Sequence, residues 1–143
     1  MNKYFNGYKR KDGSVGIRNK LLIISITGLT GPTSRKISSF LQGSLFVDNP
    51  YGGGVIGDDN LRQENAIIGF CKNPNIAAVL IISADPPKGN FIKSKLKKLE
   101  KPVSLLTLDE CNHDGIKLFE KGLRTGAKLI NCLLYTSPSP RDR

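Results

Sequence analysis

The sequence predicts an α/β fold: an open parallel sheet of Rossmann-like type, covered by helices on both faces to give three layers. The first observation is that apolar residues form continuous runs at 20–26 and 76–82, whereas a strand with one exposed face alternates. The second is that each predicted strand is followed by a loop and then by apolar residues at helical spacing. Strand–helix units in series are typical of parallel sheets.

The first unit is the strand 20–26 and the helix after it. Gly28 and Gly31 predict a turn, and Pro32 suits the first position of a helix. Apolar residues then recur at helical spacing (Ile37, Phe40 and Leu41).

Three further units follow, each with a predicted strand and a predicted helix. The strands are expected at 44–48, 76–82 and 103–108, and the first two helices at about 60–72 and 90–100. The last helix is expected to bury one face (Ile116, Phe119, Leu123, Ala127 and Ile130). Ligand-binding loops of such sheets follow the strands. They are expected at 27–32, 49–60, 83–90 and 109–115.

The predicted α/β domain is 20–131, with a motif-bearing segment 1–19 before it and a tail 132–143 after it. The tail CLLYTSPSPRDR follows neither a strand nor a helix pattern, and it resembles the translated read-through of a sequencing adaptor. We expect that it does not belong to the fold and that the rest is the truncated opening part of a longer protein. A genuine disordered tail is the alternative.

The formal net charge of +10 is compatible with nucleic acid, a membrane surface or a small anionic substrate as partner. The lysines of 93–101 surround apolar residues at helical spacing, which indicates a solvated helix face. They do not alternate with aromatic residues that could stack bases. Apolar runs stay well short of the roughly 20 residues of a membrane span, and 1–13 carries no apolar signal core. The sequence therefore predicts a cytoplasmic protein that binds neither nucleic acid nor membrane.

Two residue patterns have a chemical and a plain structural interpretation. Cys71, Cys111 and Cys132 form no C-x-x-C pair, which favours buried or idle thiols over disulfides, a zinc site or a nucleophile at Cys111. His113, the only histidine, lies in a loop after a predicted strand. It is a candidate general base or metal ligand, with an ordinary loop residue as the alternative.

The glycine-rich loop matches G-x-G-x-x-G spacing at Gly52, Gly54 and Gly57, between a strand and a helix, where backbone N–H groups cradle a pyrophosphate. Asp58 and Asp59 disfavour a dinucleotide, because a phosphate needs positive potential there. The alternative is a flexible loop in which Asp59 or Asn60 caps the following helix.

The most distinctive segment is 7–19, GYKRKDGSVGIRN, which leads straight into a predicted buried strand. It resembles the G-Y-x-R-x-D-G-R-x-G-x-R-N motif of the altronate and galactarate dehydratase family, which also holds the large subunit of sulfolactate sulfo-lyase. The resemblance continues in 49–54, NPYGGG, where the family typically has H-P-Y-G-C-G, and in 73–75, NPN, where it has H-P-N.

The resemblance implies a hydro-lyase that removes water from a sugar acid such as altronate or galactarate, assisted by iron or another divalent metal. A metal or guanidinium lowers the barrier by neutralising the enediolate that forms next to the carboxylate. The candidate catalytic residues are Arg18, Asn19, Asn49 and His113, and the candidate metal ligands are Asp58 and Asp59. The candidate substrate-binding residues are Arg18, Asn19, Gly52, Gly53 and Gly54.

For the lyase, we expect the anionic substrate over the loops that follow the strands, near 49–59, with Arg18 and nearby lysines supplying positive potential. A purely structural role for Arg18 and Asn19, tying the N-terminal segment to the sheet, is an equal alternative. We also expect a separate small subunit and a homo-oligomer.

Departures from the family pattern favour an alternative function. Where the family has cysteine or histidine, this chain has Leu29, Asn49 and Gly53. A glycine-cysteine-glutamate segment is replaced by 85–87, DPP, and a Gly-Gly-Thr turn by 112–114, NHD. Glycine and leucine side chains cannot ligate a metal. The alternative is a non-catalytic relative that binds an anionic sugar acid or supports a partner subunit.

Overall fold

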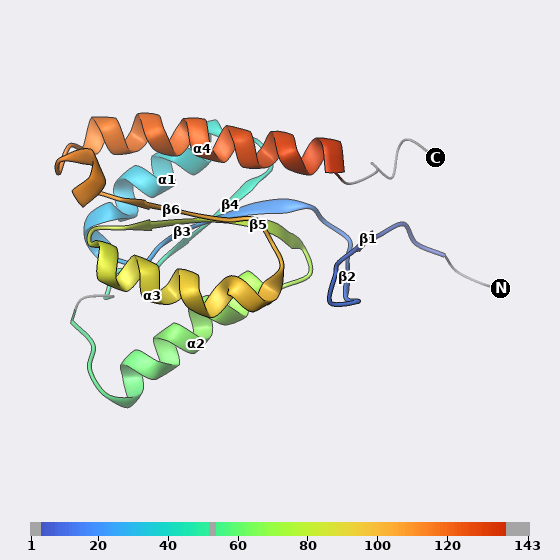
Figure 1. The fold of residues 1–143 in the computed structure, drawn as a ribbon, viewed down its shortest axis with the longest axis horizontal. Coiled ribbons are helices and arrows are strands. Elements are labelled where there is room, and N and C mark those ends of the chain that lie inside the picture. The colour runs from blue at the N-terminus through green and yellow to red at the C-terminus, as the bar shows by residue number, and fades with distance from the viewer. Residues whose placement is uncertain (1–3, 52–53, 137–143) are drawn as a thin grey trace.

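The computed structural model describes residues 4–51 and 54–136 (Figure 1). A two-stranded antiparallel hairpin precedes a four-stranded parallel sheet. The strands are β1 (Tyr8–Lys9), β2 (Val15–Gly16), β3 (Lys20–Ser25), β4 (Ser44–Asp48), β5 (Ile76–Ser83) and β6 (Val103–Thr107). The helices are α1 (Gly31–Phe40), α2 (Asp58–Lys72), α3 (Pro86–Leu96) and α4 (Gly115–Thr136), with short 3-10 turns η1 (Gly28–Thr30), η2 (Lys97–Leu99) and η3 (Asp109–Cys111).

The sheet order is β4-β3-β5-β6, and every neighbouring pair is parallel. Ile23 on β3 pairs with Phe46 on one side and with Leu80 on the other. Every residue of β5 is buried, as its continuous apolar run predicts. The predicted parallel sheet is therefore confirmed.

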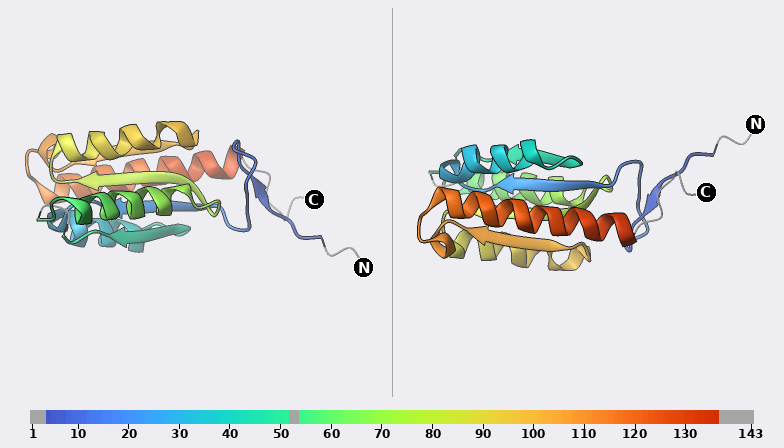
Figure 2. Two further views of the ribbon diagram at one scale, coloured as in Figure 1. Left: turned by 90° about the horizontal axis from the view of Figure 1, so that it is seen from below. Right: turned by 90° about the horizontal axis from the view of Figure 1, so that it is seen from above.

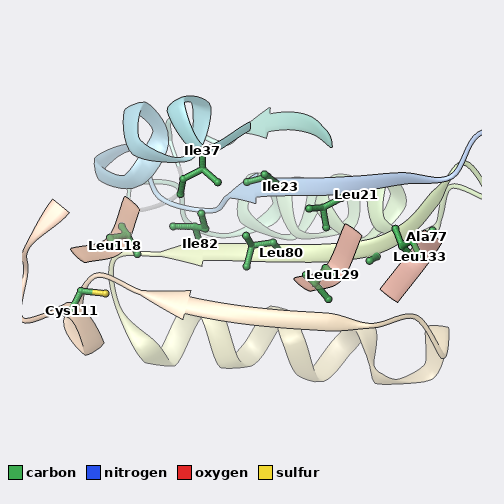
Figure 3. Close-up of a cluster of buried hydrophobic side chains, with 11 residues drawn as sticks. Leu21, Ile23, Ile37, Ala77, Leu80, Ile82, Cys111, Leu118, Leu129 and Leu133 are labelled. Carbon is green, nitrogen blue, oxygen red and sulfur yellow. The ribbon is translucent and has the colours of Figure 1, made fainter. Parts of the chain in front are cut away.

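Two apolar clusters make the core, one on each face of the sheet. Figure 2 shows α1 and α4 on one face and α2 and α3 on the other. Leu21, Ile23 and Leu80 face the α1–α4 layer, where they pack with Leu118 and Leu129 (Figure 3). The other cluster joins alternate strand residues to Ile67 on α2 and to Ile92 and Leu96 on α3. The predicted three-layer arrangement is confirmed.

Helices α2 and α3 begin earlier than the sequence patterns predicted. Pro86 and Pro87 start α3, because proline is tolerated in the first turn of a helix, and the Asp85 carboxylate accepts a hydrogen bond from the Lys88 N–H. Helix α2 starts at Asp58 after Gly57, which has a φ of 65°, and has no side-chain cap. The predicted cap by Asp59 or Asn60 is therefore wrong.

Three residues of the predicted α4 face, Phe119, Leu123 and Ile130, are half-buried and pack against the core cluster, but the fully buried residues lie on the neighbouring side of the helix. Ile116 is 73% exposed, whereas Leu118, Leu129 and Leu133 are buried. The reason is Gly122: a Cβ there would lie 2.3 Å from the Ile37 Cδ1 of α1, so the small residue lets the helices approach closely. Sequence periodicity alone does not distinguish such a glycine from a loop residue.

Helix α4 continues past the boundary predicted at Cys132 and reaches Thr136. Leu133 is 7% exposed and belongs to the core cluster, because it lies four residues after Leu129 on the same helix face. The prediction that 132–143 forms no helix is therefore wrong for residues 132–136. Residues 137–143 lie outside the described part.

The N-terminal hairpin is fixed to the sheet by long-range hydrogen bonds. The Arg10 guanidinium donates to the carbonyl oxygens of Pro74 (2.7 Å) and Arg18 (3.1 Å) and to Asn19 Oδ1 (2.9 Å). Asn75 Oδ1 accepts from the backbone N–H groups of Ile17 and Arg18. Two strands this short are not stable alone, so these contacts maintain the hairpin.

Candidate functional site

The four parallel strands all end in a polar residue at one edge of the sheet, which we call the carboxyl edge: Ser25, Asp48, Ser83 and Thr107. After β3 the chain returns to β4 on one side, and β5 lies on the other side. The loops after β3 and β5 therefore flank the topological switch point, where ligands bind in open α/β sheets. This edge is the candidate site.

A network of buried hydroxyl groups joins the two loops at the switch point. Thr27 Oγ1 accepts a hydrogen bond from the Ala84 N–H at 3.0 Å. Thr30 Oγ1 lies 3.0 Å from Thr27 Oγ1 and 2.9 Å from Ser25 Oγ. Because these hydroxyls bond to one another, they fix the loops and are not free for a ligand.

Asp48 lies where β4 meets the start of α1. A Cβ on Gly31 would lie 2.9 Å from either carboxylate oxygen, so the glycine lets this side chain lie against the start of α1. Asp48 Oδ1 is buried and has no hydrogen-bond partner, although a buried carboxylate oxygen ordinarily has one. Asp48 was not among the candidate residues predicted from the sequence. The signal that could have identified it is that each parallel strand ends in a polar residue, which in β4 is Asp48.

A small pocket of about 100 Å³ opens beside the end of β4. Its polar residues are Asp48, Asn49 and Gln63, and its apolar wall comes from β4 and α2 (Val47, Ala66, Ile67 and Phe70). The Asn49 Nδ2 amide donates to Gln63 Oε1 at 3.4 Å. The pocket therefore offers amide donors and acceptors beside a carboxylate, a set suited to hydroxyl groups.

The other predicted residues of this edge are exposed. Asp58 and Asp59 lie in the first turn of α2, where the helix dipole favours negative charge. Asp59 lies 3.5 Å from the Arg62 guanidinium. Gly54 is exposed, and Gly52 and Gly53 fall outside the described residues.

His113 lies in the turn after β6, with a left-handed backbone (φ 58°). Its Nε2 is 3.6 Å from the Asp109 carboxylate, and its side chain is 74% exposed. No other predicted site residue bonds to it among the described residues. This exposed position fits the alternative stated above, in which His113 is an ordinary loop residue.

Arg18 and Asn19 lie at the opposite end of the sheet, because they precede β3 whereas 49–59 follow β4. Six residues of β3 separate the two ends, roughly 20 Å of extended chain. Asn19 Oδ1 accepts from Arg10, and the exposed Arg18 guanidinium donates to the neighbouring Ile17 carbonyl oxygen, while the Arg18 backbone bonds to Asn75 and Arg10. The single site expected from the sequence is therefore not assembled within one chain.

Cys71 and Cys111 are buried, as the idle-thiol interpretation predicted. Burial raises the pKa of Cys71 to about 12, and burial also raises the pKa of Cys111. Neither thiol has the lowered pKa of a nucleophile.

The raised pKa of Cys71 predicts a loss of stability in alkali. An unfolded chain releases the thiol proton near pH 9, whereas the folded chain keeps it up to about pH 12. Stability is therefore complete below pH 9 and falls by about 1.4 kcal/mol per pH unit between the two values. Urea titrations at increasing pH will measure this slope, and Cys71→Ser should flatten it. An equal slope in the variant would contradict the assignment.

The described residues do not fit the divalent metal that the family resemblance implies. Among residues 4–51 and 54–136, no three His, Cys, Asp or Glu side chains gather as a metal site needs. The loops of this edge carry Leu29 and Asn49, whose side chains are not usual metal ligands. We therefore derive no step through a metal.

Comparison with known proteins adds independent evidence. The family model "D-galactarate dehydratase/Altronate hydrolase, second domain" matches residues 7–132. The (2R)-sulfolactate sulfo-lyase subunit beta of Chromohalobacter salexigens is 30% identical over 99 residues, which are 69% of this chain and 25% of that protein. Altronate dehydratase of Escherichia coli is 31% identical over 85 residues, 52% of this chain and 17% of that protein. Altronate dehydratase of Bacillus subtilis is 25% identical over 91 residues, 57% of this chain and 18% of that protein.

No solved structure matches the chain. In the described parts, no helix is long and apolar enough to cross a membrane. The chain spans a quarter or less of the length of these relatives. Because the second-domain family model matches residues 7–132, the chain belongs to the D-galactarate dehydratase/altronate hydrolase family.

Proposed function

We propose that this domain is part of a hydro-lyase and binds the hydroxyl groups of a sugar acid, such as altronate or galactarate, at the carboxyl edge. The observation that carries the proposal is Asp48 Oδ1, a buried carboxylate oxygen with no partner beside a pocket lined by Asn49 and Gln63. A substrate hydroxyl supplies the donor that this oxygen lacks.

The chemistry of the reaction suits this placement. Dehydration removes a proton next to a carboxylate and a hydroxyl from the neighbouring carbon, so the substrate must be held in one orientation. Asp48 accepts from one hydroxyl, and the amides of Asn49 and Gln63 bond to others. A pocket of about 100 Å³ holds only part of a sugar acid, so the remainder of the substrate contacts other groups.

Two further parts of the proposal concern metal and partners. We infer that any iron or other divalent metal assisting the reaction is held outside the described residues, because these supply no donor set. The relative from Chromohalobacter is named a subunit, which supports a separate small subunit for this protein as well. We also propose that the reaction takes place in the cytoplasm.

Binding of galactarate and altronate to the 143-residue chain tests the proposal. We expect Asp48→Asn to weaken binding roughly 10- to 100-fold in calorimetry, because a charged acceptor becomes a neutral amide, one end of which donates instead of accepting. Glu120→Gln removes one charge from an exposed position of α4 and is the matched control. Failure of the unmodified chain to bind either acid would contradict the proposal.

The second candidate function is a non-catalytic relative that binds a sugar acid or supports a partner. Leu29, Asn49 and Pro86 favour it, because they stand where the resemblance described above leads us to expect cysteine or histidine, and neither leucine nor proline offers a polar side chain. An assay for elimination from altronate, galactarate and sulfolactate separates the two candidates. Turnover lost in Asp48→Asn supports the lyase, and binding without turnover supports the non-catalytic relative.

A further inference from the structure

The N-terminal hairpin has one face packed on the domain and one face open. Gly16 on β2 is buried, and a Cβ there would lie 2.2 Å from the Pro74 carbonyl oxygen, to which Arg10 also donates. Side chains alternate along a strand, so Lys9 and Val15, which lie opposite each other, point to the other face. We call this the outer face. Figure 2 shows the hairpin beyond the end of the sheet, away from the loops that follow the strands.

The outer face carries an apolar patch. Phe5 and Val15 are 71% and 48% exposed. They meet over Gly7, where a Cβ would lie 3.3 Å from Phe5 Cε2 and 2.5 Å from Val15 Cγ1. Ile17, two residues after Val15, is 55% exposed. Apolar side chains that gather on a surface, unlike scattered ones, indicate an interaction site.

Strand β1 also has a free main-chain edge. The Arg10 N–H donates to the Ser14 carbonyl oxygen at 2.8 Å, which makes these two residues a hydrogen-bonded pair. Bonded and non-bonded pairs alternate in an antiparallel ladder, so the next pair, Lys9 and Val15, is non-bonded. The Lys9 N–H and C=O groups therefore point away from β2. In the described part of the chain, no strand pairs with that side of β1.

Positive charge surrounds the hairpin, at the end of the sheet that we call the amino end. It is formed by the segments that precede the parallel strands (4–20, 41–44, 72–76 and 97–103). Their charged residues are nine cations and two acids (Lys9, Arg10, Lys11, Arg18, Lys20, Lys72, Lys97, Lys98 and Lys101 against Asp12 and Glu100).

The cations of the amino end have no acidic partner in the chain. Among the described residues, none of them forms an ion pair. Arg10 and Lys101 donate to backbone carbonyl oxygens, which carry no net charge. Complementary charge steers and selects partners at protein interfaces. The amino end therefore favours an acidic partner.

We propose that the amino end docks an acidic, extended segment of another protein, which adds as a third strand beside β1. The main chain of that segment bonds to the outward N–H and C=O groups of Lys9, and its apolar side chains cover Phe5 and Val15. Its carboxylates pair with the surrounding cations. The docking does not depend on sugar-acid binding, because the carboxyl edge lies at the other end of the sheet.

A second copy of this chain does not fit the surface. Two hairpin edges bring lysines against lysines, which repel each other. The acidic side chains at the carboxyl edge are no counterpart either, because they lie among a similar number of cations. These cations are Arg35, Lys36, Arg62, Lys88, Lys117 and Lys121.

Nucleic acid also fits less well than an acidic protein segment. It would use the positive charge. It makes no use of the Lys9 main chain, and bases stack on aromatic rings rather than on aliphatic side chains such as Val15 and Ile17. An extended protein segment uses the charge, the apolar patch and the free edge together.

Titration of the 143-residue chain with synthetic peptides tests the charge and the apolar patch. The probe is Glu-Val-Glu-Phe-Glu-Val-Glu, which alternates as a strand does. We expect it to bind at least about tenfold more tightly than a peptide of equal charge with serine in place of valine and phenylalanine. Its binding should weaken at high salt. The same peptide with lysine in place of glutamate should not bind.

Variants that remove charge locate the contact on the chain. Lys9→Gln with Lys11→Gln should weaken binding of the acidic peptide at least about tenfold. The control, Arg124→Gln with Lys128→Gln, removes equal charge from exposed positions of α4 and should bind like the unmodified chain. Equal binding by both double variants would overturn the proposal.

Val15→Ser removes part of the apolar patch and should also weaken binding of the acidic peptide. Its control is Ile116→Ser, which removes an exposed apolar side chain from α4 and should leave binding unchanged. The Arg10 amide, which is bonded to Ser14, reports by its hydrogen exchange whether the hairpin stays formed in Val15→Ser.

Hydrogen exchange at the Lys9 amide gives the decisive result. This N–H points away from β2, so bound peptide should slow its exchange at least about tenfold, whereas the Arg10 amide should change less. Unchanged exchange at Lys9 in the saturated complex would overturn strand addition. The proposal also fails if the acidic peptide does not bind, if the serine peptide binds equally, or if a single-stranded oligonucleotide or phosphatidylserine vesicles bind more tightly.

Discussion

Replacing Gly16 by alanine is expected to destabilise the protein by about 2–3 kcal/mol, because the new methyl group has no room. A Cβ at this position would lie 2.2 Å from the carbonyl oxygen of Pro74 and 2.7 Å from its carbonyl carbon. These are backbone atoms, so a side-chain rotation cannot relieve the clash. The hairpin must move away from the 73–75 loop, which breaks the hydrogen bonds of Arg10 to Pro74 and of Asn75 to Ile17.

Urea unfolding of Gly16→Ala measures this loss, and Gly69→Ala is its control. Gly69 lies inside α2, and a Cβ there would meet nothing within 4 Å. Alanine is a better helix former than glycine, so the control should gain about 0.5–1 kcal/mol. An unchanged free energy of unfolding in Gly16→Ala would show that the hairpin does not contribute to stability.

The parallel sheet could be predicted because its signal is local. An apolar run such as 76–82 has to be covered on both faces wherever it lies, so the sequence alone indicates a central strand. The hairpin gave no such signal. Its strands are two residues long, and the bond that fixes it joins Arg10 to Pro74, 64 residues away. Sequence periodicity carries no information on a contact of that kind.

The candidate site was predicted in part. The rule for parallel sheets correctly indicated that the loops after Ser25, Asp48 and Ser83 meet at one edge. The same rule excludes Arg18 from that edge, since a residue that precedes a parallel strand lies at its other end. The motif of residues 7–19 favours a functional role for Arg18, but it carries no information on which end of β3 the side chain occupies.

Asp48 shows what sequence reasoning lacked. The residue type is ordinary at the end of a strand, and its burial depends on Gly31, which leaves space for the carboxylate over the start of α1. Its unpaired oxygen Oδ1 is a property of the packed structure. Polar strand ends indicate the edge where ligands bind, whereas the unsatisfied oxygen arises only from the packing of β4 against α1.

Thr27→Val is expected to lower the free energy of unfolding by about 2–3 kcal/mol, although the two side chains have nearly the same shape. The Thr27 hydroxyl accepts from the Ala84 N–H and contacts Thr30 Oγ1, and Thr27 is 8% exposed. Valine leaves the Ala84 N–H without a partner away from water. Each unsatisfied buried group costs about 1–3 kcal/mol.

Thr27→Ser separates the hydroxyl from the methyl group. Serine retains the acceptor for the Ala84 N–H, so we expect the variant to lose no more than about 1 kcal/mol, the value of one buried methyl group. Hydrogen exchange at the Ala84 amide should become faster in Thr27→Val and stay near its original rate in Thr27→Ser. Equal exchange in the two variants would mean that the hydroxyl does not join the loops after β3 and β5. The switch point would then be held by packing alone, and the polar edge would be free to rearrange around a ligand.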